Sequence, residues 1–582
     1  MEVNRRNTYL ISGALKNFVL ASVLTAAAAQ LASTCDAIVL AQFEGEEAMS
    51  ALSLVLPVTT FISCVGLLLA FGANALSAKA IGHHDLDGAA AIFSTAVWSI
   101  LTIGVGVSVL AFFGVPVLMR LITDEPSLRE LPAGYLRVYT LGAWLEMLSY
   151  ALCLFVAADG HPRRVTVAVV VGMAVNIVVD VLAVGYLDWG IVGVACGTLC
   201  QFVANILMLS LYFRRPSCSY RLTWPAMRWR QLLRNMQGGA SVSIGNVLMS
   251  VSVLLIGNIC FNALGERGFF FWSVCLQVLL VTVVFINGVI EALFAIGGTM
   301  LGEHDLNGFQ LLARRALLGI SVLVGLFMLV LFVPDVVGVV FGVEDPSELA
   351  ALNHVVRIFS WMLIPFSLSL ILVAVYQVLE LDVLSVVSVV SLLAVLIGMV
   401  YCFSMSVPGH LWYAFPLGAF LFLGLQLLYS YVRSRMQHGR VSGLTLIPYS
   451  SGGHSLDCSV HYQQDEVAAV LLQMRAFLEE AGIDKPAISG IEACCEELMT
   501  AIVLHAAGRV TNHSFDVHVY AKRQSVLLAI KYGGRPFDPL GLGKRRMAAN
   551  MTEDVSYKYM YGQNVVLIKV NQLATPGCTE AL

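Results

Sequence analysis

Twelve runs of predominantly apolar residues follow one another through the first three quarters of this chain, and each is long enough to cross a lipid bilayer. A helix needs about 20 such residues to span roughly 30 Å of hydrocarbon. With glycine, proline and clusters of charge as boundaries, the spans lie at 15–41, 50–78, 92–120, 134–158, 163–187, 190–213, 238–262, 270–300, 312–342, 353–379, 382–406 and 409–433. The pattern predicts an all-α membrane protein with twelve transmembrane helices.

The composition of the chain changes near residue 455. Overall, 58% of the 582 residues are apolar and 12% are charged, whereas soluble proteins carry roughly 25% charged residues. Beyond residue 455 the charged fraction is about twice that of the preceding part, so a water-soluble domain follows the membrane domain. The net charge of −4 and the scattered basic residues disfavour a nucleic-acid partner. Most of the 13 cysteines stand singly in apolar runs and are expected to be reduced.

The loops between the predicted spans alternate in charge. Basic residues gather at the N-terminus, in every second loop and after the last span, whereas the other loops are acidic or nearly neutral. The positive-inside rule then places both termini and the C-terminal domain in the cytoplasm, in agreement with an even number of spans. The first run is too long for a signal peptide and is expected to be retained. We expect a multi-pass protein of the cell (inner or plasma) membrane.

A repeated motif divides the membrane region into two halves. The chain reads G-H-H-D-L-D-G at Gly82 to Gly88, after the second span, and G-E-H-D-L-N-G at Gly302 to Gly308, after the eighth. Recurrence at matching positions predicts two six-helix lobes related by an internal repeat. The predicted domains are an N-lobe (1–213), a cytoplasmic inter-lobe linker (214–237), a C-lobe (238–440), a second linker (441–456) and a cytoplasmic domain (457–582).

Several phrases of the membrane region resemble the multidrug and toxic compound extrusion (MATE) family over about residues 10–440. They are C-D-A-I-V-L-A-Q-F-E-G-E-E-A-M-S-A-L-S-L-V-L-P-V from Cys35, D-G-H-P from Asp159 and N-I-V-V-D from Asn176, followed by W-G-I-V-G-V-A. The resemblance implies an antiporter, not an enzyme, that exports small organic compounds and whose lobes rock about a central cavity. The alternative is a flippase or exporter of lipid-linked sugars or polysaccharides. It is disfavoured because the apolar runs hold few basic residues to bind a diphosphate.

Acidic residues inside predicted spans are costly and need a partner, a cation or a proton. Asn176 and Asp180 are four residues apart and share a helix face, and Asp36 and Thr198 add a carboxylate and a hydroxyl. Such oxygen ligands suit Na⁺, and a carboxylate pair also suits a proton. The MATE resemblance implies that these four residues form a cation site of the N-lobe, although packing or helix-backbone roles are open for Asn176 and Thr198, and solvation for Asp36. Glu291 is a possible second proton or substrate site.

The C-terminal region combines two helical patterns, at about 465–482 and 487–507, with four predicted strands. The strands are placed at 515–521, 525–532, 555–561 and 564–570, and the mixture predicts an α+β two-layer sandwich. The phrases E-E-L-M-T-A-I-V-L-H-A from Glu496 and G-G-R-P-F-D-P-L from Gly533 resemble the histidine-kinase-like ATPase fold of anti-sigma factor kinases.

The nucleotide positions that this second resemblance implies are damaged. Four residues after Glu497, where the family has a Mg²⁺-binding Asn, stands Ala501, whose methyl group cannot coordinate a metal. Two residues before Gly534, Tyr532 replaces the Asp that accepts from adenine. The degenerate site comprises Glu497, Ala501, Tyr532, Gly534, Gly541 and Gly543.

Three interpretations of the C-terminal domain stay open. It is a pseudo-ATPase that regulates transport, binds a cytoplasmic protein partner or self-associates through 457–582. Alternatively, it binds a nucleotide through the basic triplet 544–546 without hydrolysis, or it is an active serine kinase. Beyond Na⁺ or H⁺ as coupling ion, no cofactor is expected.

Overall fold

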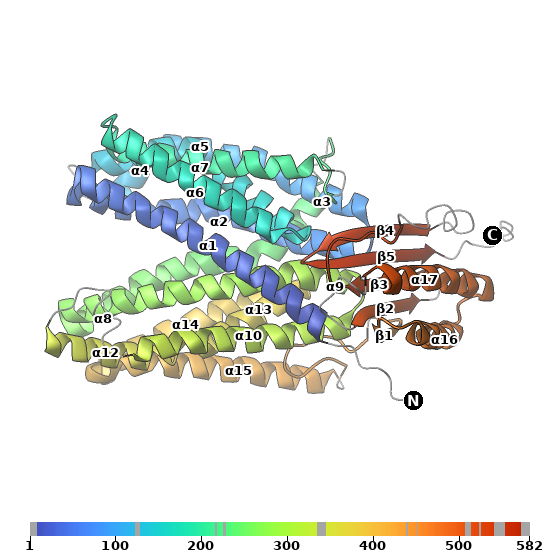
Figure 1. The fold of residues 1–582 in the computed structure, drawn as a ribbon. Helices are drawn as coiled ribbons and strands as arrows, with labels where there is room; N and C mark the ends of the chain where they lie inside the picture. The colour runs from blue at the N-terminus through green and yellow to red at the C-terminus, as the bar shows by residue number, and fades with distance from the viewer. Residues whose placement is uncertain are drawn as a thin grey trace, which may run out of the picture.

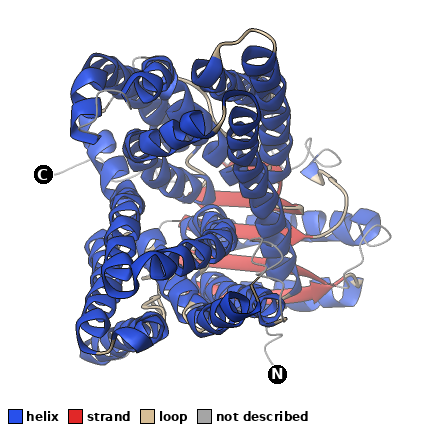
Figure 2. Ribbon diagram, turned by 90° about the vertical axis from the view of Figure 1, so that its left-hand side faces the viewer, coloured by secondary structure: helices blue, strands red, loops and turns tan. Residues whose placement is uncertain are grey.

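The structure, a computed structural model, describes residues 8–122, 129–215, 218–224, 228–333, 345–437, 440–450, 452–506, 514–522, 525–540 and 553–571. Figure 1 shows a long bundle of helices with a β-sheet at one end, and Figure 2 shows the bundle along its length with the sheet behind it. Eleven helices of the described residues are long and apolar enough to cross a membrane.

A first helix group is formed by α1 to α7. Its members are α1 (Tyr9–Glu44), α2 (Glu46–Gly82), α3 (Leu86–Ser99), the π-helical turn η1 (Ile100–Gly104), α4 (Val105–Ile122), α5 (Glu130–Ala158), α6 (Pro162–Gly185) and α7 (Gly190–Phe213). Helices α6 and α7 coincide with two predicted spans to within two residues. The agreement follows from the bilayer, which fixes how long an apolar helix must be.

A second helix group follows. Its members are α8 (Trp229–Ala292), the π-helical turn η3 (Leu293–Gly297), α9 (Gly298–Gly302), α10 (Leu306–Phe332), α12 (Pro346–Ser360), α13 (Leu363–Val378), α14 (Asp382–Ser406), the 3₁₀ helix η4 (Pro408–Tyr413) and α15 (Ala414–Met436). A straight helix of 64 residues would be roughly 96 Å long, but α8 is interrupted at Gly265, where φ is +69°. Beyond this turn the chain returns, and the Trp272 ring faces Gly257. Helix α8 therefore consists of two segments that pack side by side.

The repeated motif makes the same local structure in both helix groups. Asp85 caps α3 by accepting from the backbone N–H of Gly88 at 2.8 Å. Asp305 caps α10 by accepting from Gly308 at 2.7 Å. An N-cap carboxylate satisfies one of the unpaired N–H groups of the first helical turn. The two copies are thus equivalent in structure as well as in sequence.

The first glycines of the two motifs pack against each other where the helix groups meet. A Cβ atom on Gly82 would lie 2.1 Å from the carbonyl oxygen of Thr299, and one on Gly302 would lie 2.1 Å from the carbonyl oxygen of Lys79. Any side chain at either position would push the two backbones apart. The helix groups converge at this end, next to the sheet, and diverge toward the other end (Figure 1).

The C-terminal domain, residues 454–571, packs two helices on one face of an antiparallel sheet. Its elements are β1 (His454–His461), α16 (Gln464–Glu480), α17 (Lys485–Ala506), β2 (Ser514–Lys522), β3 (Ser525–Tyr532), β4 (Glu553–Met560) and β5 (Gln563–Asn571), with strand order β1-β2-β3-β5-β4. The helices cover the face of the sheet that is turned away from the bundle (Figure 1). Apolar residues of both layers form one core, as expected for a two-layer α+β sandwich.

The ends of both predicted linkers differ from the sequence prediction. Strand β1 was not predicted, and it begins at His454, inside the predicted linker 441–456. It follows directly on the Gly- and Ser-rich residues 450–453, whose composition is typical of a linker. Helix α8 begins at Trp229, inside the predicted linker 214–237, because the basic residues there occupy its exposed face while Leu232 and Asn235 are buried. The end of the predicted span 312–342 lies outside the described residues.

Candidate functional site

Three polar side chains meet inside the first helix group. Asn176 and Asp180 lie one turn apart on α6 and are fully buried, and Asp36 of α1 faces both. Five atoms have no hydrogen-bond partner among the described residues: Oδ1 of Asp36, Oδ1 and Nδ2 of Asn176, and both carboxylate oxygens of Asp180. Burying unpaired polar atoms costs several kcal/mol each in an apolar medium. Their arrangement fits a bound cation or proton.

A glycine of the next helix makes room for this cluster. A Cβ atom on Gly197 of α7 would lie only 1.8 Å from Oδ1 of Asp180 and 3.2 Å from Nδ2 of Asn176. One turn earlier, a Cβ atom on Gly193 would lie 2.9 Å from that of Ala183. Small residues let helices approach closely in a membrane, and here the close approach of α7 leaves space for a carboxylate.

Thr198, the fourth predicted member of the site, differs from the other three. Its hydroxyl donates to the backbone oxygen of Val194 at 3.1 Å, so it satisfies its own helix. Tyr135 of α5 lies close to Thr198 and Asp36. The structure therefore brings Asp36, Asn176 and Asp180 together and leaves Thr198 beside them with its donor already in use.

The donor set of the cluster has the chemistry of a small hard cation site. Two carboxylates and an amide oxygen are hard ligands of the kind that Na⁺ takes, and two carboxylates at this depth need a positive charge or a proton between them.

A cavity of about 240 Å³ lies between the two helix groups, and two carboxylates line it. Glu291 of α8 is one of them, as the sequence predicted an intramembrane acid there. The other is Glu146 of α5, which accepts from the Ser63 hydroxyl at 2.6 Å and from the Tyr139 hydroxyl. Sequence reasoning missed Glu146, although the same insertion cost applies to any acid within the predicted span 134–158.

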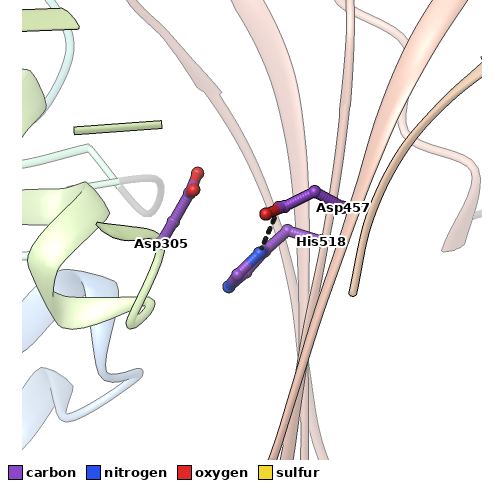
Figure 3. A group of neighbouring side chains, drawn as sticks. All are labelled: Asp305, Asp457 and His518. Atoms are coloured by element: carbon purple, nitrogen blue, oxygen red, sulfur yellow. Dashed lines mark hydrogen bonds and ion pairs between the residues drawn. The ribbon is translucent and has the colours of Figure 1, made fainter. Parts of the chain in front are cut away.

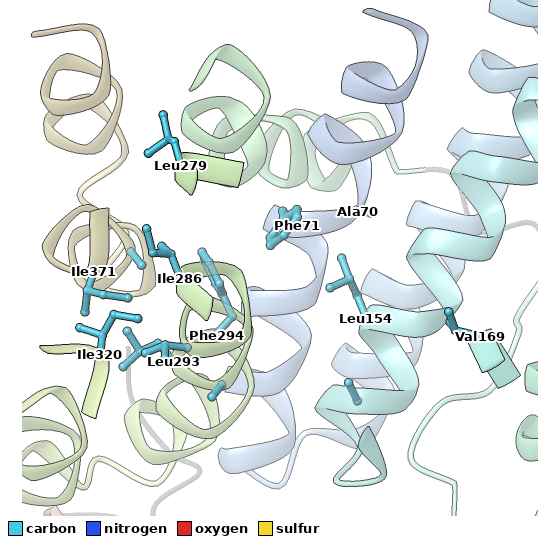
Figure 4. Packing of buried hydrophobic residues seen from close by; sticks show 14 of the residues in the cluster. Ala70, Phe71, Leu154, Val169, Leu279, Ile286, Leu293, Phe294, Ile320 and Ile371 are labelled. Carbon is cyan, nitrogen blue, oxygen red and sulfur yellow. The ribbon is translucent and has the colours of Figure 1, made fainter. Parts of the chain in front are cut away.

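Next to this cavity, aromatic and aliphatic side chains of both helix groups pack together, among them Phe71 and Phe294 (Figure 4). Phe71 of α2 lines it and meets the Phe294 ring of η3 edge-on, with ring centroids 5.5 Å apart. The contact joins the first helix group to the second. Toward the sheet, the cavity thus ends in apolar packing.

The C-terminal domain contacts the second helix group through the loop between α9 and α10. Nζ of Lys531 in β3 lies 2.5 Å from Oε2 of Glu303, and both side chains are buried. Nε2 of His518 in β2 lies 3.1 Å from the Glu303 backbone oxygen, and the Tyr520 ring stacks on His304.

Asp305, Asp457 and His518 come together at the same contact (Figure 3). Their ligand-type atoms lie within 4.8 Å of one another, as a metal site would require. However, Nδ1 of His518 is hydrogen-bonded to Oδ1 of Asp457 at 2.7 Å, and Asp305 caps α10. We therefore interpret these three residues as part of the contact between the C-terminal domain and the α9–α10 loop, and not as a metal site.

The domain contacts the first helix group through its last hairpin. Lys558 of β4 pairs with Asp159 and donates to Ser219, and burial lowers the pKa of Lys558 although Asp159 opposes the shift. At the hairpin turn, the Tyr561 hydroxyl donates to the Ala158 oxygen at 2.6 Å and its backbone N–H donates to Gly160 at 3.0 Å. One sheet thus contacts both helix groups.

The predicted nucleotide positions do not form an open site where they are described. Tyr532 is fully buried in the core between sheet and helices, its hydroxyl donates to the Phe537 oxygen at 2.5 Å, and burial raises its pKa. Glu497 and Ala501 lie on α17, and Gly534 follows β3 with φ of +101°. Gly541 and Gly543 lie outside the described residues.

The sequence is similar to known export proteins. A model of the MatE family matches residues 21–182. The multidrug export protein MepA of Staphylococcus saprophyticus is 24% identical over 217 residues, which cover 37% of this chain and 48% of that protein. MepA of Staphylococcus aureus is 26% identical over 174 residues, 30% of this chain and 39% of that protein. The chain spans less than half the length of these curated relatives.

Solved transporters share the fold of the membrane part. A transporter of the MOP superfamily from Pyrococcus furiosus is 20% identical with a TM-score of 0.67, covering 76% of this chain and 100% of that chain. An outward-facing MATE family multidrug resistance transporter is 21% identical with a TM-score of 0.67, covering 75% and 99%. The membrane part therefore has the fold of these transporters.

Proposed function

We propose that this protein is a cation-coupled antiporter that exports small organic molecules across the cell membrane by alternating access. The observation that carries the proposal is the cluster of Asp36, Asn176 and Asp180 beside Gly197. Five of its buried polar atoms have no hydrogen-bond partner in the described part of the chain. A Na⁺ ion or a proton would satisfy them. Binding of that cation from one side of the membrane and its release on the other would shift the equilibrium between the outward-open and inward-open states.

The cavity between the helix groups favours a cationic substrate. Glu146 and Glu291 line it, and no Lys or Arg is found among its described lining residues. Carboxylates attract a positive charge strongly where water is scarce, whereas the diphosphate of a lipid-linked sugar would be repelled. Export of organic cations is therefore preferred to flipping of a lipid-linked sugar.

In the proposed orientation, the twelve spans form two six-helix lobes, and both termini and the C-terminal domain are cytoplasmic. The helix groups converge at the end that carries the sheet and diverge at the other (Figure 1). This arrangement corresponds to an outward-open state, and an outward-facing transporter shares the fold.

The C-terminal domain would restrain transport without hydrolysing a nucleotide. It holds Glu303 of one lobe through Lys531 and Asp159 of the other through Lys558. The inward-open state requires the lobes to separate at this end, so a docked domain favours the outward-open state. A cytoplasmic partner, or a second copy of the domain, would regulate transport by displacing it.

The experiment is gradient-driven transport of a fluorescent organic cation in proteoliposomes. We expect Asp180→Asn to abolish uptake driven by an imposed Na⁺ or pH gradient. Thr140→Val is the matched control, because Thr140 is also fully buried but its hydroxyl already donates to Leu136 at 2.6 Å. If Asp180→Asn exchanges substrate at the normal gradient-driven rate, the coupling assignment is wrong.

A further inference from the structure

A second polar cavity lies where the C-terminal domain meets the first helix group. Its volume is about 300 Å³, at the lower end of the roughly 300–1,000 Å³ typical of small-molecule sites. Three segments line it: Asn17 of α1, residues 160–164 at the start of α6, and Tyr559, Tyr561 and Gly562 of the β4–β5 hairpin. None of these residues belongs to the proposed transport sites.

The charge of this cavity is one-sided. Arg163 and Arg164 line it, and among the described residues neither forms an ion pair. Arg164 lies over the Tyr212 ring, with its guanidinium carbon 5.3 Å from the ring centroid, and interacts with Arg215 nearby. The ring keeps one face of the guanidinium in place while its N–H groups stay available.

The acid closest in sequence does not neutralise these arginines. Asp159 is buried, and it accepts from the backbone N–H of Ser219 at 3.0 Å and from the Tyr212 hydroxyl at 2.5 Å, besides pairing with Lys558. Its charge is therefore already compensated. Burial lowers the pKa of His161, although Asp159 opposes the shift.

The helix itself adds to the positive potential. Helix α6 is 24 residues long and begins at Pro162, directly beside both arginines. A helix N-terminus carries a partial positive charge and favours phosphate groups. Arginine guanidinium groups hold phosphate oxygens through paired, charge-assisted hydrogen bonds.

We propose that this cavity, the α6 pocket, binds the phosphate group of a phosphate ester, either a phospholipid headgroup or a soluble phosphorylated molecule. Arg163 and Arg164 would hold the phosphate from the lobe, while the hairpin residues would contact the rest of the ligand. A bound ligand would then join α6 to the β4–β5 hairpin and stabilise the docked domain. The proposal concerns ligand binding and does not depend on transport.

Two measurements on the full-length protein separate the sources. The first is calorimetric titration of detergent-solubilised protein with AMP. The second is the thermal shift on transfer from phosphatidylcholine nanodiscs to nanodiscs that contain phosphatidylglycerol. We compare the wild type with Arg164→Gln and with Arg163→Gln. If one of these variants misfolds, the other still tests the proposal. Arg435→Gln is the matched control, because its guanidinium also lies 5.3 Å from a tyrosine ring centroid but on α15.

We expect the α6 variants to bind AMP at least about tenfold more weakly than the wild type, or to lose the thermal shift caused by phosphatidylglycerol. Arg435→Gln should behave like the wild type in both measurements. A loss confined to AMP identifies a soluble ligand, and a loss confined to phosphatidylglycerol identifies a lipid. If the α6 variants and the control respond alike to both probes, or if the wild type responds to neither, the proposal is overturned.

Discussion

The ammonium group of Lys531 and the carboxylate of Glu303 lie 2.5 Å apart at the boundary between the sheet and the membrane helices, and both are buried. They are 228 residues apart in sequence. A buried ion pair is held in place strongly because each charge is costly without the other. The pair can therefore form only while the C-terminal domain is docked on the membrane helices.

Removing one partner of this pair should destabilise the protein strongly. We expect Lys531→Met to lower the free energy of unfolding by about 3–5 kcal/mol, because the Glu303 charge is left buried without a partner. Glu303→Leu combined with Lys531→Met should recover most of this loss. Thermal unfolding of the full chain measures both.

The control for this prediction is an exposed ion pair in the same domain. Arg475 of α16 lies 3.8 Å from Glu479 and 3.7 Å from Glu492, and about half of its own side chain is exposed. Its removal by Arg475→Ala should cost no more than about 1 kcal/mol. Equal losses at the two pairs would mean that burial of the Lys531 pair contributes nothing.

Acid should loosen the docked domain through His304. Its ring lies between His83 and Tyr520, with centroid distances of 4.9 and 4.2 Å. Burial, helped by His83 and Lys522, lowers its pKa to about 4, against an ordinary value of about 6.5. The folded protein binds the proton of His304 less well than the unfolded chain does, so the free energy of unfolding is highest above pH 6.5 and falls as the pH drops toward 4. The loss should be about 2 kcal/mol after allowance for the partial exposure of His304.

The measurement is thermal unfolding of the full chain between pH 7.5 and 4.5. His304→Phe keeps a ring against Tyr520 without a titratable nitrogen, so its pH dependence should be shallower than that of the wild type. His461→Gln changes an exposed histidine and serves as control. A slope that is the same in all three proteins would rule out His304 as its source.

Gly197→Ala should damage the cation cluster without changing any of its side chains. The new Cβ atom would overlap Oδ1 of Asp180, and overpacking of this kind costs about 1–3 kcal/mol. We expect loss of gradient-driven transport and of any stabilisation by Na⁺. Gly398→Ala in α14 is the control, because nothing lies within 4 Å of its Cβ position. Normal transport by Gly197→Ala would contradict the placement of the site.

The C-terminal domain should not bind ATP in a Mg²⁺-dependent manner. Tyr532 fills the core where an adenine acceptor would be needed, and its hydroxyl is bonded to Phe537. Titration of the full chain with ATP and Mg²⁺, in an Arg164→Gln background that removes the α6 pocket, should show no Mg²⁺-dependent heat. Micromolar binding that requires Mg²⁺ would show instead that the nucleotide site works.

The membrane helices were predictable because a bilayer requires about 20 apolar residues in every span. The predicted span 190–213 is α7 to the residue. The pairing of Asn176 with Asp180 was predictable because residues at i and i+4 share a helix face, and acids within apolar spans are rare enough to stand out. That Asp36 joins them was implied only by the resemblance to the MATE family. The role of Gly197 in making room for the cluster was not predictable, because the sequence does not indicate which side chain packs against a given glycine.

Contacts between distant segments were beyond reach of the sequence alone. Nothing in the surroundings of Lys531 or Lys558 indicates that each meets a carboxylate hundreds of residues earlier in the chain. Glu146 is a different case, because the insertion cost that identified Glu291 applies equally to it. Its two hydroxyl partners, Ser63 and Tyr139, show how the cost is met.

The docking of the hairpin also has a consequence for biosynthesis. The side-chain amide of Gln563 donates to the backbone oxygen of Leu10 at 2.9 Å, across 553 residues. At about 5–20 residues per second, a ribosome needs roughly half a minute to two minutes to make the chain between them. During that time the start of the first helix waits in the membrane without its final partner. Only a chain that has been translated beyond Gln563 can form this hydrogen bond, so the contact requires that the last hairpin has already been made.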